Sequence, residues 1–425
     1  MRLQKLIYQG IVWRGMYYAS VFALNIVIAR VYKAADSGLI NYLINNLSFL
    51  LLVTSFSLES ALGYFGSRDE IKAGRLTALS LLFALGSALA STLAMLLFIE
   101  REPVHTNLNV LLLSFVYVLG FVLNNYFSAL FYARQKVVLP NIVFIVINLL
   151  VLVYSIYGDK TSFLLVYFVS FLAQGMLLFV AWCAESGALS EMRLPSPADL
   201  RKLLNYAFTA LVANLIFFLV YRVDYWFVKS FADDAALGNY IQVSKLGQIF
   251  LLLPSIIATA VFTRTARGNQ EQVKHVIEII SRWLLVMYVL VVLAIAVTGK
   301  WLFPAIYGQS FNQMYGPFLL LSPGIVSLSM LALITAFNAG KHRININIKG
   351  SVIALLVIVA GNLVFVPRYG IYAAALVSSV GYICFQVYVL AHFKKEYRSG
   401  VLAFFVPRMS DWQKVKQFVR GNEAN

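Results

Sequence analysis

The chain has 425 residues, of which 61% are hydrophobic and only 12% are charged, and its mean hydropathy is +0.79. A soluble domain carries roughly 25% charged residues, so this composition excludes an ordinary soluble surface and requires lipid as the main solvent of the exterior. The formal net charge of +16 does not indicate a nucleic-acid partner, because the basic residues lie in short loops between apolar stretches, as in membrane proteins.

Apolar stretches of about 20 residues, the length that crosses a bilayer as a helix, follow one another along the chain. We count twelve: residues 8–32, 38–65, 74–99, 107–133, 137–157, 162–184, 204–230, 237–263, 281–299, 316–339, 344–366 and 370–392. The sequence therefore predicts an all-α polytopic membrane protein of about twelve transmembrane helices. An even number of spans places both termini on the same side of the membrane.

Lysine and arginine are divided unevenly between the two sides that this span order defines. About 25 fall on the side of the termini and about 7 on the other side, with Arg222 and Lys245 left inside spans. The positive-inside rule then places both termini in the cytoplasm. We expect a multi-pass protein of the cytoplasmic (plasma) membrane.

The two halves of the chain resemble each other. Leu3–Gly10 resembles Leu200–Ala207 and Ala35–Tyr42 resembles Asp233–Tyr240, at offsets of about 197 and 198 residues. A parallel repeat of six spans predicts two six-helix bundles around a pseudo-twofold axis along the membrane normal, with a cavity between them. The predicted domains are the N-terminal bundle 1–184, a cytoplasmic linker 185–203, the C-terminal bundle 204–392 and a basic cytoplasmic tail 393–425.

The predicted tail leaves two interpretations open. Trp412, Val415 and Val419 share one helical face, with basic residues elsewhere on the helix. This pattern fits a helix lying on an anionic inner leaflet, and it fits a solvated basic end equally well.

Motifs of catalysis and of cofactor binding are missing from the sequence. It contains no phosphate-binding G-x-x-x-x-G-K-[ST] motif, and its four histidines are scattered without metal-ligand spacing. Asp233 and Asp234 have the composition of an acidic pair in a membrane glycosyltransferase, but a turn with a helix N-cap explains them better. We expect no enzyme, no cofactor and no metal.

Charged residues inside spans are costly, by about 2.5–3.5 kcal/mol at the bilayer centre, and therefore mark candidate functional positions. Arg14 and Glu59 come to equal depth on spans one and two, toward the cytoplasmic side, and Asp224 and Lys245 come to equal depth on spans seven and eight, nearer the middle. We predict two ion pairs, for gating, coupling or helix register.

Arg222 does not share a helix face with Asp224, which is two residues away. Arg222, Trp226 and Lys229 form one cationic and aromatic stripe on span seven, with i, i+4, i+7 spacing. Other spans carry further polar stripes: Gln242, Lys245 and Gln248; Asn41, Asn45 and Ser48; Asn124, Asn125 and Ser128. Polar stripes on several spans favour a wetted, positively charged cavity, which suits an anionic, hydroxyl-rich ligand.

The stretch Tyr221–Pro254 resembles the start of the second half of polysaccharide-repeat-unit flippases of the Wzx type, in the multidrug/oligosaccharidyl-lipid/polysaccharide exporter superfamily. The R-x-D at Arg222 and Asp224, the acidic turn and the Gly238-Asn239-Tyr240 element carry the resemblance. It implies a V-shaped, MATE-like pair of bundles that alternates access. It also implies an undecaprenyl-pyrophosphate-linked oligosaccharide substrate, as used for O-antigen, capsule or exopolysaccharide.

The predicted function is therefore a flippase that moves this lipid-linked oligosaccharide from the inner to the outer leaflet. We predict that Arg222 binds substrate, with Lys245, Arg30 and Lys229 as further cationic contacts. The candidate partners are membrane lipids and the polysaccharide polymerase and chain-length regulator of the same pathway, with no nucleic acid. Two alternatives stay open: a multidrug or toxin cation exporter of the same fold, and a membrane polysaccharide polymerase or glycosyltransferase.

Overall fold

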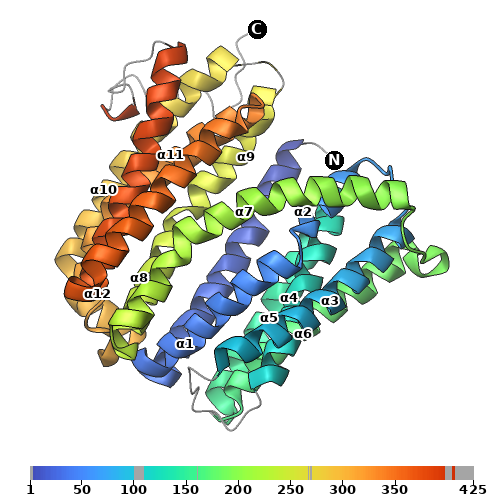
Figure 1. Cartoon of the computed structure of the whole chain (residues 1–425), viewed down its shortest axis with the longest axis horizontal. Coiled ribbons are helices and arrows are strands. Elements are labelled where there is room, and N and C mark those ends of the chain that lie inside the picture. The colour runs from blue at the N-terminus through green and yellow to red at the C-terminus, as the bar shows by residue number, and fades with distance from the viewer. Residues whose placement is uncertain are drawn as a thin grey trace. The chain divides into compact units, whose positions relative to one another are not determined.

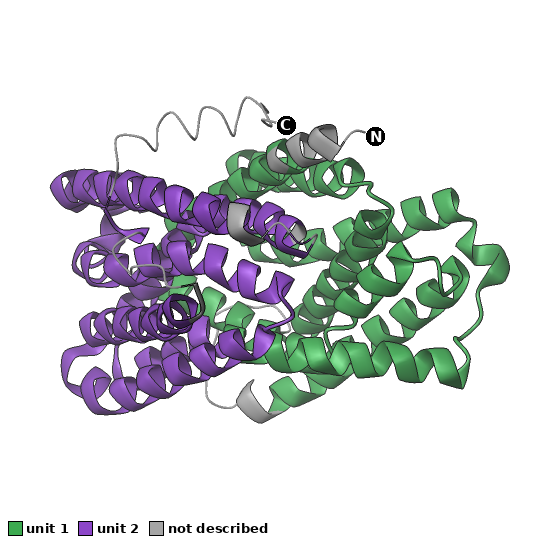
Figure 2. Cartoon of the chain, turned by 90° about the horizontal axis from the view of Figure 1, so that it is seen from above, with its two compact units in different colours: residues 1–218 green, residues 219–425 purple. Residues whose placement is uncertain are grey.

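The computed structural model describes residues 3–99, 110–159, 161–266, 268, 270–397 and 404–406, and these residues form helices with no β-strand among them. The chain divides into two compact units, residues 1–218 and 219–425 (Figure 2). The predicted interfacial segment around Trp412 lies outside the described residues.

The first unit contains, in its described residues, six α-helices, a 3₁₀ helix and the start of a seventh α-helix (Figure 1). They are α1 (Leu3–Thr54), α2 (Leu58–Ser67), α3 (Ala73–Ile99), α4 (Val110–Ala133), α5 (Val138–Tyr157), α6 (Phe163–Ser186), the 3₁₀ helix η1 (Ala188–Glu191) and α7 (Pro197–Phe231).

Helix α1 contains the first predicted span and most of the second. A straight helix of its 52 residues would be about 78 Å long, more than twice the hydrocarbon core of a bilayer. At Lys33 the backbone leaves the helical region, with φ 56° and ψ −173°, and α1 folds back on itself there (Figure 1). The fold-back lies between the first two predicted spans, residues 8–32 and 38–65.

The second predicted span, residues 38–65, is broken. Phe56 and Ser57 have positive φ angles of 59° and 49°, and the helix restarts at Leu58 as α2. The carbonyl of Ser55 accepts a hydrogen bond of 2.8 Å from the hydroxyl of Tyr126 and one of 3.1 Å from the backbone N–H of Leu58. In lipid such a break is tolerated only where other protein groups satisfy the backbone.

Helices α4 and α6 are packed closely through glycine. A Cβ atom on Gly120 would lie 2.3 Å from the backbone nitrogen of Leu172, and one on Gly175 would lie 2.7 Å from the Cβ of Leu123. Small residues at such a crossing let helix backbones approach in a membrane, where dispersion and hydrogen bonds replace the hydrophobic driving force.

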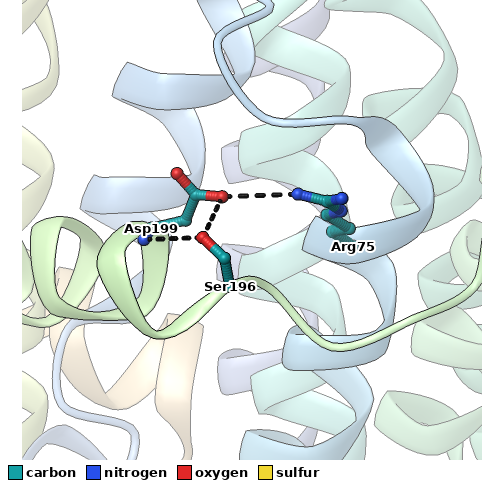
Figure 3. Close-up of polar contacts among 3 residues, drawn as sticks. All are labelled: Arg75, Ser196 and Asp199. Atoms are coloured by element: carbon teal, nitrogen blue, oxygen red, sulfur yellow. Dashed lines mark hydrogen bonds and ion pairs between the residues drawn. The ribbon is translucent and has the colours of Figure 1, made fainter.

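The predicted linker, residues 185–203, is fastened to the first unit by polar contacts (Figure 3). Arg75 forms an ion pair of 3.4 Å with Asp199, whose carboxylate also accepts a hydrogen bond of 2.7 Å from Ser196. The backbone N–H of Asp199 in turn donates to the Ser196 hydroxyl, which fixes the start of α7. Lys72 forms a second ion pair, of 2.9 Å, with Glu191 of η1.

The first part of α7 packs on α1 and α2 through aromatic rings. Ring centroids are 4.7 Å apart for Tyr206 and Tyr64, 5.9 Å for Phe208 and Phe56, and 5.8 Å for Phe218 and Phe49. These contacts explain why the first unit extends to Phe218, beyond the predicted linker and into the predicted seventh span.

The second unit contains, in its described residues, the rest of α7, five further α-helices and a second 3₁₀ helix (Figure 1). They are α8 (Asp234–Phe250), α9 (Leu252–Ala266), α10 (Gln270–Tyr307), the 3₁₀ helix η2 (Gln309–Phe311), α11 (Tyr315–Gly340) and α12 (Ile344–Tyr397). Helix α12 contains the last two predicted spans and turns back at Gly370, where φ is 55° (Figure 1). Glycine adopts this left-handed conformation without the steric cost of a Cβ atom.

The eighth predicted span is also interrupted, but more mildly than the second, because the residue between its two helices, Leu251, keeps right-handed angles of φ −81° and ψ −11°. Residues 237–263 are divided between α8 and α9 at Leu251, three residues before Pro254. Leu251 follows Ser55 by about 196 residues, close to the offset of the sequence repeat. Both halves thus interrupt the same span at nearly the same point.

Ten apolar helical stretches in the described residues are long enough to cross a membrane, and two of them, in α1 and α12, contain a fold-back. The predicted fold class, an all-α multi-pass membrane protein, is confirmed. The helices extend beyond several predicted spans, most clearly α10, because polar and basic turns continue the helix past its apolar centre.

Candidate functional site

Asp224 of α7 is the most buried charged group in the second unit's candidate site, with only 1% of its surface exposed. The hydroxyls of Tyr240 on α8 and of Ser378 on α12 both donate hydrogen bonds to its Oδ2, the latter at 2.9 Å. Its Oδ1 has no hydrogen-bond partner within the described residues. Three helices therefore converge on one carboxylate.

The predicted ion pair between Asp224 and Lys245 is wrong. Equal depth along two helices does not fix which way the side chains face, and Asp224 faces the hydroxyls of Tyr240 and Ser378 instead. The pocket around it is aromatic: the rings of Tyr225 and Tyr240 meet edge to face at 6.0 Å. A carboxylate held in such surroundings bears a desolvation cost of several kcal/mol unless it takes up a proton or a cation.

Arg222 lies on another face of α7 and meets α8. Its Nη2 donates a hydrogen bond of 3.2 Å to Oε1 of Gln248, and its guanidinium carbon lies 5.8 Å from the centre of the Tyr225 ring. Lys245 lies on α8 one turn before Gln248 and is partly buried. We call Arg222, Lys245 and Gln248 the cationic cluster.

Lys229 is placed differently from the prediction. Its Nζ forms an ion pair of 2.7 Å with Asp234, in the turn between α7 and α8. The neighbouring Asp233 caps α8, because its carboxylate accepts a hydrogen bond of 2.7 Å from the backbone N–H of Ala236. Both aspartates thus have structural partners, which favours the N-cap interpretation over a glycosyltransferase pair.

The predicted ion pair between Arg14 and Glu59 is also wrong. Arg14 is exposed, and its guanidinium carbon lies 5.0 Å from the centre of the Tyr132 ring. Glu59 is in the first turn of α2, beyond the break at Ser55–Ser57. The depth argument assumed one continuous helix from the turn to Glu59, and the break removes that assumption. Arg30 is exposed near the end of the first arm of α1.

The first unit has a neutral polar interior. Asn124 of α4 donates to Gln174 of α6 at 3.2 Å, Gln174 donates to Asn148 of α5 at 3.0 Å, and Asn148 donates to Ser20 of α1 at 2.9 Å. We call these four side chains the amide relay. Chains of this kind hold membrane helices together, so Asn124 of the predicted span-four stripe has a structural partner.

A cavity of about 610 Å³ lies beside the break in the first unit. Phe56 and Phe83 line it from one side, and Leu204, Asn205, Phe208 and Thr209 of α7 line it from the other. Its lining contains no charged side chain among the described residues.

Sequence reasoning missed the residues that meet Asp224. Ser378 lies 154 residues after Asp224, and one serine in an apolar span carries no local signal. Tyr240 did have a local sequence signal, because it belongs to the Gly238-Asn239-Tyr240 element that follows the acidic turn. The amide relay was partly visible in Asn124, but its partners on α5 and α6 were not.

Comparison with protein-family models finds no match to the chain, and neither does comparison with curated proteins. Solved structures share its fold. An inward-facing multidrug resistance MATE family transporter of the MOP superfamily matches with a TM-score of 0.68 and 13% identity, over 99% of this chain and 97% of that one. The lipid II flippase MurJ, in an inward closed conformation, matches with a TM-score of 0.66 and 13% identity, over 99% and 94%.

A third structure, the Vibrio cholerae MATE transporter VcmN in its bent form, matches with a TM-score of 0.62 and 12% identity, over 95% of this chain and 98% of that one. At these identities the similarity establishes that the chain shares the fold of these three structures.

Proposed function

We propose that the protein is a flippase, which moves undecaprenyl-pyrophosphate-linked oligosaccharide repeat units from the inner to the outer leaflet by alternating access. The observation that carries the proposal is the cationic cluster of Arg222, Lys245 and Gln248, partly buried within a transporter fold. Among the proteins of this fold is one named as a lipid II flippase.

The chemistry of the cluster suits such a head group. The guanidinium of Arg222 is always charged and binds phosphate oxygens in bidentate geometry, while the amide of Gln248 offers hydrogen bonds to sugar hydroxyls. Each hydroxyl without a partner costs roughly 2–7 kcal/mol in hydrocarbon, so an oligosaccharide needs a protein path. The outward movement of a negative charge gains about 2.3 kcal/mol per charge per 100 mV, inside negative.

The second candidate function, export of multidrug cations, is favoured by the name of one structural neighbour, a multidrug resistance transporter. The charge of the cluster opposes it, because the guanidinium of Arg222 would repel a cationic drug. For the enzyme alternative, the Asp233–Asp234 pair is already used in a helix cap and an ion pair. We therefore propose a transporter that is not an enzyme.

The proposal includes the setting that the sequence predicted. It places the chain in the cytoplasmic membrane with both termini in the cytoplasm, and it assigns the polysaccharide polymerase and the chain-length regulator as partners downstream of the flippase. O-antigen, capsule and exopolysaccharide repeat units are the substrate class.

The test is a deletion strain that carries either the wild type, Arg222→Ala or the control Arg68→Ala, whose guanidinium lies at the exposed end of α2. We expect lipid-linked repeat units to accumulate facing the cytoplasm in the deletion strain. Wild type and Arg68→Ala should clear them, and Arg222→Ala should clear them at least tenfold more slowly, because a buried charge-assisted contact contributes about 1.5–3 kcal/mol.

Three other results would change the conclusion. If no units accumulate, the substrate class is wrong and cation efflux becomes the next assay. If units reach the outer face without being polymerised, the protein is the polymerase. If Arg222→Ala clears units as fast as Arg68→Ala, the flippase remains but the cationic cluster is not its binding site.

A further inference from the structure

The second unit has a long apolar groove that is separate from the cationic cluster. It has a volume of about 720 Å³ and lies between α10, α11 and the second arm of α12. Most of its lining is aliphatic. The other lining side chains are the polar Ser322, Ser327 and Gln386, the aromatic Phe405 and the basic Lys394. None of the residues of the cationic cluster, and neither Asp224 nor Tyr240, lines it.

The polar groups on the floor of the groove are engaged with the protein. Ser327 donates a hydrogen bond of 2.6 Å to Gln386, and Ser322 donates one of 2.9 Å to the carbonyl of Leu319. That carbonyl lacks its helical donor because Pro323, four residues later, has no N–H. The floor therefore offers a ligand few hydrogen bonds, and the groove favours an apolar ligand.

The rim of the groove is open. Leu293 on α10 and Val387 on α12 are 56% and 60% exposed, whereas Met330 on the floor is 1% exposed. In a multi-pass membrane protein, exposed aliphatic side chains on spanning helices face lipid. A concave, aliphatic surface of this kind is filled by hydrocarbon.

The length of the groove matches one leaflet. On α12 its lining runs from Ile383 to Lys394, which is about 16 Å along a helix. The hydrocarbon core of a bilayer is about 30 Å thick, so the groove reaches from one edge of the core to about its middle. The groove is therefore about as long as the part of one leaflet that a single acyl chain spans.

Lys394 gives the groove a positive end. It is exposed in the last turns of α12, and no ion pair to it is found in the part of the chain that the structure describes. An ammonium at the edge of the core lies at the depth of lipid phosphates, where each basic residue adds to the attraction of anionic lipid.

From the apolar floor, the open rim, the length of one leaflet and the lysine at the end, we infer that the groove is a binding site for an anionic phospholipid. One acyl chain lies along Met330 and Val387, and the head-group phosphate lies at Lys394. The inference rests on the groove alone and holds whether or not the protein flips an oligosaccharide.

The test is native mass spectrometry of the full chain, released from detergent after titration with palmitoyl-oleoyl phosphatidylglycerol or with phosphatidylcholine of the same chains. Lys394→Gln should lower the binding of phosphatidylglycerol about fivefold and leave phosphatidylcholine unchanged, as expected for one basic residue near a membrane surface. Lys395→Gln is the matched control, because Lys395 is exposed next in the chain but does not line the groove.

A second pair of variants tests the acyl chain. Val387→Trp fills the groove from its exposed rim and should lower the binding of both lipids. Val380→Trp, on the same face of α12 two turns away from Val387, should lower neither, because Val380 does not line the groove. Because both positions are exposed, the substitutions leave the core of the unit intact.

Several outcomes would overturn the inference. One is that Val387→Trp binds phosphatidylglycerol as the wild type does, and another is that Lys394→Gln and Lys395→Gln behave alike. If undecaprenyl phosphate displaces phosphatidylglycerol at equal concentration and Val387→Trp abolishes that competition, the groove is a polyprenyl site. If a chain ending at Val406 binds several times more of both lipids, the C-terminal segment is its natural occupant.

Discussion

The interiors of the two units differ in chemistry although their helices follow the same plan. Both units break one span at nearly the same point of the repeat, at Ser55–Ser57 and at Leu251. In the first unit the polar interior is the neutral amide relay, whose side chains form hydrogen bonds across four helices, although Oδ1 of Asn124 has no partner in the described residues. In the second unit it is the carboxylate of Asp224, with one oxygen unpartnered in the described residues, next to the cationic cluster.

This difference indicates a division of roles. A neutral hydrogen-bonded network holds helices together but offers no charge to an ionic ligand. A buried charge with spare bonding capacity is costly, and in membrane proteins such charges mark ion and substrate paths. We therefore expect ion and substrate binding in the proposed transporter to depend more on the second unit than on the first.

The largest expected effect is on ion coupling. Each unit has one acidic side chain that is a candidate for coupling transport to an ion. In the first unit it is Glu59, just after the break, and in the second it is Asp224, which accepts a hydrogen bond from Tyr240. If Asp224 takes the coupling proton or sodium ion, Asp224→Asn removes the dependence of flipping on pH or sodium. It should also slow driven flipping by about 5- to 150-fold, the usual range of a coupling free energy. The measurement is transport of a lipid-linked substrate in proteoliposomes with imposed gradients.

Glu59→Gln is the matched variant for this comparison. The division of roles predicts that it retains the ion dependence of the wild type. Loss of the dependence in Glu59→Gln alone would reverse the roles of the two units. A dependence that survives in both variants would end the coupling hypothesis for either carboxylate and leave the membrane potential as the driving force.

A smaller effect is expected on stability in the second unit. Tyr240→Phe removes one of two donors to the buried carboxylate and should lower the free energy of unfolding by roughly 1.5–3 kcal/mol, the range for hydrogen bonds to charged groups. Tyr225→Phe is the control, since its buried hydroxyl has no hydrogen-bond partner in the described residues. Unfolding in mixed micelles of mild detergent and dodecyl sulfate measures both.

If Tyr225→Phe costs as much as Tyr240→Phe, the contact with Asp224 contributes nothing specific. The double variant Tyr240→Phe with Asp224→Asn completes a double-mutant cycle. It should show a coupling of at least about 0.5 kcal/mol between the two side chains, as expected for residues in contact.

The smallest effect is expected in the first unit. Asn148→Leu cuts the amide relay at its centre, which leaves Ser20 and Gln174 each without one partner. Double-mutant cycles on membrane helices average about 0.6 kcal/mol per hydrogen bond, with a maximum near 1.7, so we expect a loss in this range. Asn125→Leu, on α4 but outside the relay, should change the unfolding free energy less than Asn148→Leu in the same assay. Equal losses would mean that the relay contributes no more than any amide in a span.

Composition and apolar run length were sufficient to predict the fold class and the position of nearly every span. They work because the bilayer forces each crossing to be a long apolar helix with its backbone satisfied internally. The interruptions at Ser55–Ser57 and Leu251 were not predicted, because the length of an apolar run does not reveal where a helix is interrupted within it. Pro254, just past the second break, was a signal that run length did not use.

The candidate site was predicted in its residues but not in its pairings. Helical spacing singled out Arg222 and Lys245 but paired Lys245 with Asp224, whereas in the structure Arg222 bonds Gln248 on α8, one turn after Lys245. Spacing along the chain could not tell which neighbour Asp224 faces, because that depends on the rotation of three helices about their axes. The partner from α12, Ser378, is set by tertiary packing alone.

The aromatic contacts of α7 have a consequence for the order in which the chain is made. The six predicted spans of the first half end at residue 184, but the rings of Tyr206, Phe208 and Phe218 that cover α1 and α2 come from the next helix. Chains grow from the N-terminus and domains close as they emerge. The nascent first unit therefore stays incomplete, with Phe56 and Tyr64 lacking these partners, until the ribosome has released residues well into the seventh span.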